Sequence, residues 1–173
     1  MINANKYCKD QHIEICMLNL KTTFNSHIMV VYRAPTGNFN LFLNRLDDSI
    51  TSIYRADLNF IFCGDINIDY LTENGTKRQL DSVLQTYNLT AIVTFPTRSQ
   101  GISSTMIDNI FTDNSKISNY TASPIFNGLS DQDAQLLTIK DINLETQGHY
   151  VYITRNINNY SINEFKISLS YET

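Results

Sequence analysis

Asp65 and Asn67 stand just after an apolar run, and their side-chain types suit phosphate or metal chemistry. The run at residues 58–63 (LNFIFC) predicts a buried strand that Gly64 ends. On an extended segment, side chains two positions apart point the same way. A carboxylate can bind a hard cation or align a water, and an amide can donate to a phosphate oxygen. The alternative is an Asx-turn that only closes the strand.

Tyr32 and Arg33 end a second apolar run, at residues 28–32 (IMVVY). A phenol and a guanidinium at a strand end can bind a phosphodiester, with the arginine making a bidentate contact. The alternative is an amphipathic tyrosine at the rim of a sheet beside a solvated arginine. Taken alone, this pair favours the second interpretation.

Two further carboxylates stand near predicted strands. Asp108 interrupts the apolar segment at residues 106–111 (MIDNIF), where a carboxylate without a partner would be costly. We therefore expect Asp108 at the open end of a strand or paired with a polar group, with a capped turn as the alternative. Asp131 and Gln132 belong to the run SDQD, just before an apolar segment at residues 134–140.

Composition limits the class of protein. The chain has 173 residues, which suits one domain, and its apolar content of 42% is enough to build a core. A net charge of −4 argues against a sequence-blind nucleic-acid coat protein, but the carboxylates of a metal site would also lower the net charge of a nuclease.

The three cysteines show no CxxC spacing, which favours free thiols in a reducing, intracellular compartment. No signal region or run of 18 apolar residues is present, so we predict no membrane partner.

The elements that position these groups follow from hydrophobic periodicity. Residues 12–20 and 28–32 predict two strands. Asn38 is the predicted N-cap of a helix whose apolar face consists of Phe39, Phe42, Leu43, Leu46, Ile50 and Ile53. Together with the strand at residues 58–63, this helix predicts a βαβ unit with parallel strands.

The second half of the chain alternates loops with short elements. Thr76 and Gln79 form a capping-box pattern at the start of a second helix, and residues 95–104 read as a polar loop. The remaining predicted strands cover residues 91–93, 105–111, 116–123, 134–140 and 150–154, and Ser161 opens a possible last helix.

The order of these motifs resembles the endonuclease/exonuclease/phosphatase superfamily. Strands that end in Tyr-Arg-x-Pro and Gly-Asp-x-Asn are followed by Pro-Thr-Arg, Ile-Asp-Asn-Ile and Ser-Asp-x. More narrowly, the set looks like the apurinic-type endonuclease domain of a non-LTR retrotransposon. The run at residues 95–98 followed by that at 104–108 favours this branch, and the resemblance covers residues 11–141.

The resemblance implies a Mg²⁺- or Mn²⁺-dependent phosphodiesterase with a role for each matching residue. Asp65 would align or activate the attacking water, and Asp108 would orient the family's histidine. Asp131 would lie beside the metal or the leaving group. The groups that would contact the substrate or its phosphate are Tyr32, Arg33, Asn67 and Arg98.

Two departures from the family pattern weaken the implied activity. Gln132 stands where the family has histidine, and an amide cannot change protonation near neutral pH. The family glutamate that binds the metal should lie upstream of the strand that carries Tyr32, and we do not assign its role to Glu14. The sequence therefore predicts a truncated αββα sandwich of two mixed sheets, of marginal stability because a sheet edge and an apolar face are exposed.

These implications define the expected organisation and function. Residues 1–10 are expected to be disordered or irregular, and 142–173 to be a linker toward an absent reverse transcriptase. The expected activity is DNA strand nicking that primes reverse transcription, in the nucleus, crippled or absent in this chain. One alternative is a non-catalytic remnant or weak nucleic-acid-binding module. Another is a phosphatase acting on lipid or inositol phosphates, which the total of only 13 Lys and Arg residues disfavours.

Overall fold

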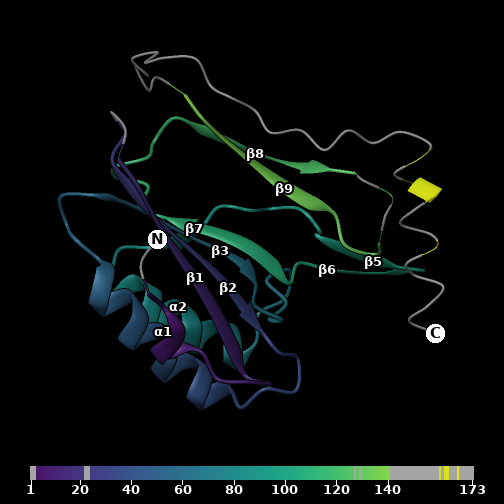
Figure 1. Cartoon of the computed structure of the whole chain (residues 1–173), viewed down its shortest axis with the longest axis horizontal. Coiled ribbons are helices and arrows are strands. Elements are labelled where there is room, and N and C mark those ends of the chain that lie inside the picture. The colour runs from purple at the N-terminus through teal and green to yellow at the C-terminus, as the bar shows by residue number, and fades with distance from the viewer. Residues whose placement is uncertain are drawn as a thin grey trace.

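A central mixed β-sheet carries helices on one face and a β-hairpin on the other (Figure 1). The computed structural model describes residues 3–21, 24–126, 128, 130–140, 160, 162, 163 and 167. The strand predicted at residues 150–154 and most of the predicted linker lie outside the described residues. Ile162 and Asn163, within the helix predicted from Ser161, are helical.

The first half of the chain forms the predicted βαβ unit. Strand β1 (Ile13–Leu20) pairs antiparallel with β2 (Ser26–Arg33), and β2 pairs parallel with β3 (Asn59–Asp65). Helix α1 (Phe39–Ile53) makes the crossover. Asn38 is its N-cap, as predicted, because its side chain accepts a hydrogen bond from the amide of Leu41 at 2.9 Å.

Two later strands complete the five-stranded sheet, whose order is β1-β2-β3-β7-β4. Strand β7 (Asp108–Thr112) pairs antiparallel with both β3 and β4 (Thr90–Ala91). It begins later than predicted because the amide of Met106 is bonded to the side chain of Asp69. The mixed α/β class predicted from the sequence is confirmed.

Helix α2 (Gly75–Gln85) begins earlier than predicted, because its N-cap is Asn74 and not Thr76. The Asn74 side chain accepts from the amide of Lys77 at 2.8 Å and from the hydroxyl of Thr76. Thr76 is therefore inside the helix, and the capping-box prediction was wrong about the first residue.

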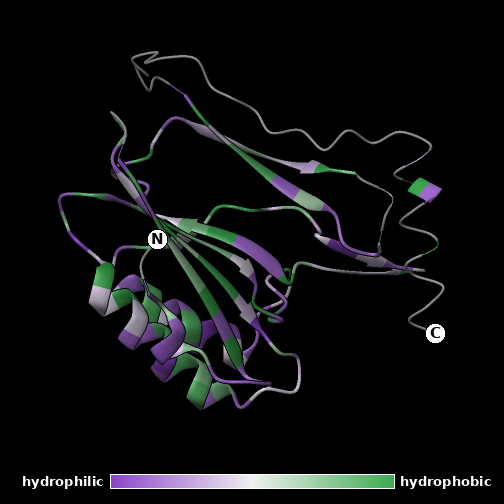
Figure 2. Cartoon of the chain, in the orientation of Figure 1, coloured by the Kyte–Doolittle hydropathy of each residue, from purple (hydrophilic) through white to green (hydrophobic). Residues whose placement is uncertain are grey.

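The main core lies between the sheet and the two helices, and Figure 2 shows hydrophobic residues along the central strands. Phe62 and Phe111, on neighbouring strands, stack at 4.8 Å between ring centroids. Part of the N-terminal segment, which was expected to be disordered or irregular, packs against the core. It forms a short 3₁₀ turn (Asn5–Tyr7), and Ala4 and Tyr7 are buried in the core.

The region predicted as a polar loop at residues 95–104 contains a hairpin of β5 (Arg98–Gln100) and β6 (Ser103–Thr105). A second hairpin, β8 (Tyr120–Ile125) and β9 (Ala134–Ile139), lies on the side of the sheet away from the helices (Figure 1). Strand β8 starts later than predicted because residues 116 and 117 belong to a turn bonded to the carbonyl of Asp113. No helix among the described residues is long and apolar enough to span a membrane.

The β8–β9 hairpin covers only part of this face. Tyr120, Leu137 and Ile139 pack against the core, whereas Val30 in β2 remains 41% exposed. Cys16, which is paired with Val30 across β1 and β2, is also exposed. An apolar area of β1 and β2 therefore faces solvent.

Candidate functional site

Asp65 and Asp108 lie next to each other at one end of the central sheet. Strand β3 continues through Gly64, which the sequence suggested would end it, and Asp65 is paired with Asp108 on β7. Directly opposed residues of antiparallel strands project on the same face. The two carboxylates therefore share the face that is turned away from the helices.

Burial gives Asp108 unusual acid–base properties. Its side chain is buried, and Oδ2 accepts a hydrogen bond from the Thr97 hydroxyl at 2.9 Å. Burial raises the pKa of Asp108 to about 6, and the negative charge of Asp65 acts in the same direction. The hydrogen bond from Thr97 opposes this shift. Asp108 is thus a carboxyl group that changes protonation close to neutral pH.

Thr97 is a buried connector that sequence reasoning did not select. Its hydroxyl oxygen accepts from the amides of Ile107 and Asp108, both at 3.2 Å, while donating to the Asp108 carboxylate. Its carbonyl accepts from the amide of Asp133. In the sequence, Thr97 belongs to the Pro-Thr-Arg run, which indicated the family resemblance but gave Thr97 no role of its own. Thr97 ties the start of β7 to the loop before β9.

The loop before β9 brings Gln132 and Asp131 to the same end of the sheet. The Gln132 amide donates from Nε2 to Oδ2 of Asp65 at 3.4 Å. Asp131 instead faces Arg98, whose Nε donates to Oδ2 at 2.6 Å. Both side chains of that pair are more than one-third exposed, so the pair contributes little to stability.

Tyr32 reaches the same face from β2. Val30 and Cys63 are paired in parallel register, and Tyr32 and Asp65 each stand two residues further along their strands. Side chains alternate along a strand, so Tyr32 projects on the side of Asp65, and it is 42% exposed. Glu14 is its partner on β1 and is exposed as well.

Arg33 and Asn67 are placed differently from what the sequence suggested. The Arg33 side chain is buried, and its guanidinium donates to the carbonyls of Ile66, Asn67 and Gly37. Burial also lowers the pKa of Arg33. The Asn67 amide donates to the Arg33 carbonyl at 2.7 Å. These hydrogen bonds attach the loop after β3 to the end of β2. Arg33 was predicted to contact phosphate, but its side chain is buried and already bonded to backbone carbonyls.

Comparisons with known proteins support the fold. No family model and no curated protein matches the chain. Among solved structures, the endonuclease domain of TRAS1, a telomere-specific non-LTR retrotransposon, matches with a TM-score of 0.57 and 15% identity over 75% of this chain and 64% of that chain. The 3′ phosphatase NExo from Neisseria, bound to product DNA hairpin, matches with a TM-score of 0.51 and 13% identity over 72% of this chain and 64% of that chain.

The chain has the endonuclease/exonuclease/phosphatase fold. A third match, the 3′-5′ exonuclease NExo from Neisseria meningitidis, has a TM-score of 0.50 and 13% identity over 75% of this chain and 71% of that chain. The chain thus spans about two-thirds of the length of these structures. Within the endonuclease/exonuclease/phosphatase fold, the cluster of Asp65, Asp108, Gln132 and Tyr32 forms the candidate site.

The described side chains do not form a complete ligand set for the magnesium ion that the resemblance implies. Mg²⁺ prefers octahedral oxygen ligands, of which one or two are usually carboxylates and the rest waters or substrate phosphate oxygens. Asp131, the predicted ligand, is paired with Arg98, and Oδ2 of Asp108 is bonded to Thr97. Among the residues that the structure describes, no group of three or more His, Cys, Asp or Glu side chains is placed to hold a metal. Asp131 is held by Arg98 in this structure, and its role as a metal ligand stays a prediction.

Proposed function

We propose that this chain is a retrotransposon-type endonuclease domain that acts on DNA phosphodiesters and whose hydrolytic activity is crippled. The observation that carries the proposal is the position of Gln132, whose amide lies 3.4 Å from the carboxylate of Asp65. The side chain beside this carboxylate can form hydrogen bonds but cannot transfer a proton.

Hydrolysis of a phosphodiester needs proton transfer at two places. The attacking water loses a proton as its oxygen bonds to phosphorus, and the leaving oxygen gains one as its bond to phosphorus breaks. Asp65 can orient the water, and Tyr32 can donate to a phosphate oxygen. An amide in place of an acid–base group typically lowers the rate by about 10²- to 10⁴-fold. Asp108, held by Thr97, has no imidazole at position 132 to orient.

DNA is the substrate class that we assign by fold similarity. One structural neighbour is the endonuclease domain of a non-LTR retrotransposon, and another is bound to a product DNA hairpin. On the same basis we propose that the natural setting is a fusion to a reverse transcriptase in the nucleus, where nicking of the target strand primes synthesis.

The test is relaxation of supercoiled plasmid in buffer with Mg²⁺ or Mn²⁺. We expect the wild-type chain and the variant Asp65→Ala to be indistinguishable, because activity is crippled. Gln132→His should raise nicking at least about tenfold over wild type, and Gln132→Asn, which keeps an amide, should not. Adding Asp65→Ala to Gln132→His should remove the gain.

Two results would contradict the proposal. Wild-type nicking that disappears in Asp65→Ala would show a competent enzyme. A Gln132→His variant with no gain would show that the residue at position 132 is not what limits the rate. Fluorescence anisotropy with a labelled duplex, measured at two salt concentrations, separates the rival interpretations. Salt-sensitive binding without cleavage indicates a binding module, and no binding indicates an inert remnant.

A further inference from the structure

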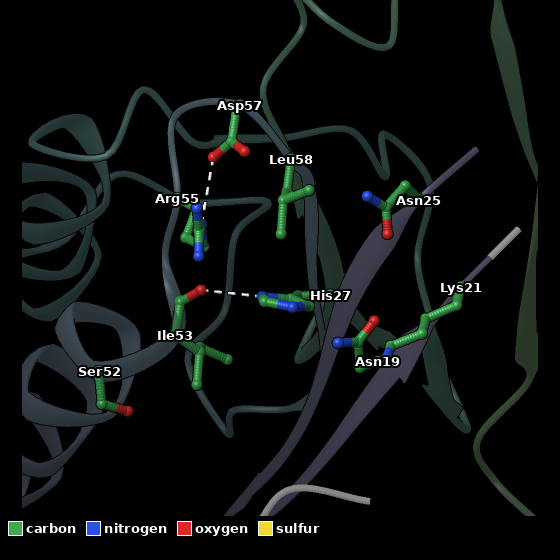
Figure 3. A pocket seen from close by; sticks show the side chains of 9 residues that line it. All are labelled: Asn19, Lys21, Asn25, His27, Ser52, Ile53, Arg55, Asp57 and Leu58. Atoms are coloured by element: carbon green, nitrogen blue, oxygen red, sulfur yellow. Dashed lines mark hydrogen bonds and ion pairs between the residues drawn. The ribbon is translucent and has the colours of Figure 1, made fainter. Parts of the chain in front are cut away.

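A polar pocket lies beside the start of β2, and Figure 3 shows the residues that line it. Its walls are the end of β1, the start of β2, the last turn of α1 and the loop that leads to β3. Its volume is about 830 Å³, within the range of roughly 300–1,000 Å³ that is usual for small-molecule sites. His27 lies near the first residue of β2 and Tyr32 near the last, so the two sites are separate.

His27 forms the inner wall of the pocket. Its side chain is 93% buried, since only 7% of its surface is exposed, and Nδ1 lies 2.8 Å from the carbonyl oxygen of Ile53. A carbonyl only accepts, so Nδ1 is the donor in this bond, and Nε2 is the ring nitrogen that remains for another partner. No partner for Nε2 is found among the described residues. Asn19 is paired with His27 across β1 and β2, so its amide lies on the same face, and Figure 3 shows the two side by side.

The rim of the pocket carries a local positive charge in an acidic protein. Lys21 and Arg55 are both exposed there, and Asp57 is the carboxylate beside them. Arg55 contacts Asp57 through Nε at 3.3 Å, which leaves the two terminal amino groups of the guanidinium for another anion. Two cations and one carboxylate give the rim a formal charge of +1, whereas the whole chain carries −4. This arrangement favours an anionic ligand.

We propose that this pocket binds a small phosphorylated molecule that also carries hydroxyl groups, such as a sugar phosphate or a nucleotide. The phosphate lies between Lys21 and Arg55, because a guanidinium and an ammonium are the side chains that bind phosphate best. A hydroxyl group of the same molecule hydrogen-bonds to Nε2 of His27 at the inner wall. The amides of Asn19 and Asn25 supply further donors and acceptors to the ligand.

The test compares three probes on the wild-type chain by calorimetry and by ¹⁵N NMR of the histidine rings. The probes are ribose 5-phosphate, inorganic phosphate and ribose. Ribose 5-phosphate should bind saturably, at least about tenfold more tightly than phosphate, and should shift the Nε2 resonance of His27. Ribose alone should not bind measurably, because the rim cations contribute nothing to it.

Matched variants locate the binding. The double variant Lys21→Gln/Arg55→Gln should weaken the binding of ribose 5-phosphate at least about tenfold. Both side chains are exposed, so the fold should be kept. The control double variant Lys9→Gln/Arg78→Gln removes the same charge from exposed positions outside the pocket and should leave the affinity unchanged. His27→Gln, which retains a hydrogen-bonding side chain, should lower the preference for ribose 5-phosphate over phosphate.

Three outcomes would overturn the proposal. The first is no saturable binding of ribose 5-phosphate below about 10 mM. The second is equal affinity for phosphate and ribose 5-phosphate, which would mean an adventitious ion only. The third is equal loss of affinity in both double variants, which would indicate a general charge effect. A single-stranded oligonucleotide that displaces ribose 5-phosphate and binds more tightly would assign the pocket to a polymer instead.

Discussion

The ionisation of Asp108 is the residue-scale property that can be tested most directly. Its pKa in the folded chain is about 6, whereas that of an unfolded aspartate is about 4. The folded state therefore holds the proton more tightly. The resulting contribution to stability is fully present below about pH 4 and is lost as the pH rises through about 6.

Asp108→Asn should remove this pH dependence, because an amide stays neutral and can still accept from Thr97. We expect the variant and the wild type to have similar free energies of unfolding at pH 4. At pH 7 the variant should be more stable by up to about 3 kcal/mol. Urea unfolding at several pH values measures the difference. If the difference in free energy of unfolding between the two proteins stays constant from pH 4 to pH 7, then burial does not raise the pKa of Asp108.

Thr97 provides a second prediction at the scale of one residue. Thr97→Val keeps the shape but removes the oxygen that serves the amides of Ile107 and Asp108 and the carboxylate of Asp108. Leaving buried polar groups without partners should lower the free energy of unfolding by about 2–4 kcal/mol. The same replacement at the exposed Thr94 should change it by less than about 0.5 kcal/mol. Similar effects at both positions would rule out the connecting role of Thr97.

At the scale of elements, Gly64 decides how closely β2 and β3 approach. Its φ angle is +139°, and a Cβ atom placed there would lie 1.9 Å from the carbonyl oxygen of Val31. Gly64→Ala should therefore separate the two strands next to Asp65 and lower the free energy of unfolding by about 4 kcal/mol or more.

Gly75→Ala is the matched control for Gly64→Ala. Gly75 is the first residue of α2, and a Cβ there meets no atom within 4 Å. The replacement should raise the free energy of unfolding by up to about 1 kcal/mol, because alanine is the better helix former. Chemical denaturation of both variants supplies the comparison. Equal costs at the two glycines would contradict the role of close strand approach.

Long elements with a regular apolar pattern were predictable from the sequence, and short polar strands were not. The α1 pattern and its cap at Asn38 depend on contacts a few residues apart, which the sequence displays. The β5–β6 hairpin has no apolar face, so no periodicity marked it. Its formation depends on pairing across the turn and on the bond between Ser99 and the carbonyl of Asp131.

At the scale of the whole molecule, the open face of β1 and β2 should bind hydrophobic dyes. Val30 is 41% exposed, and its neighbours across the strands are Cys16 and Cys63. We expect the native chain to enhance ANS fluorescence, because contiguous exposed apolar surface binds such dyes. Val30→Lys should reduce the enhancement by about half or more.

Ile102→Lys is the control for the dye experiment. Ile102 is fully exposed at the turn between β5 and β6, away from the open face. The same replacement there should leave the fluorescence unchanged, because a single exposed apolar residue is not a patch. A native chain that unfolds cooperatively without ANS binding would contradict the prediction of an open, marginally stable sandwich.

The sequence by itself determined the α/β class, the parallel βαβ unit and the positions of Tyr32 and Asp65 close to the ends of two strands. These features follow from local periodicity and from the alternation of side chains along a strand, both of which are written in consecutive residues. The same local pattern was misleading for Arg33, because the direction of its side chain depends on the loop after β3.

Only the tertiary structure decided which groups meet. Gln132 reaches Asp65 across 67 positions of sequence, and Thr97 reaches Asp108 from a separate loop. It also decided that Asp131 faces Arg98 and that His27 and Arg55 line one pocket. The physical reason is that such contacts depend on how strands are ordered and how loops pack in three dimensions, which no local pattern of residue types specifies.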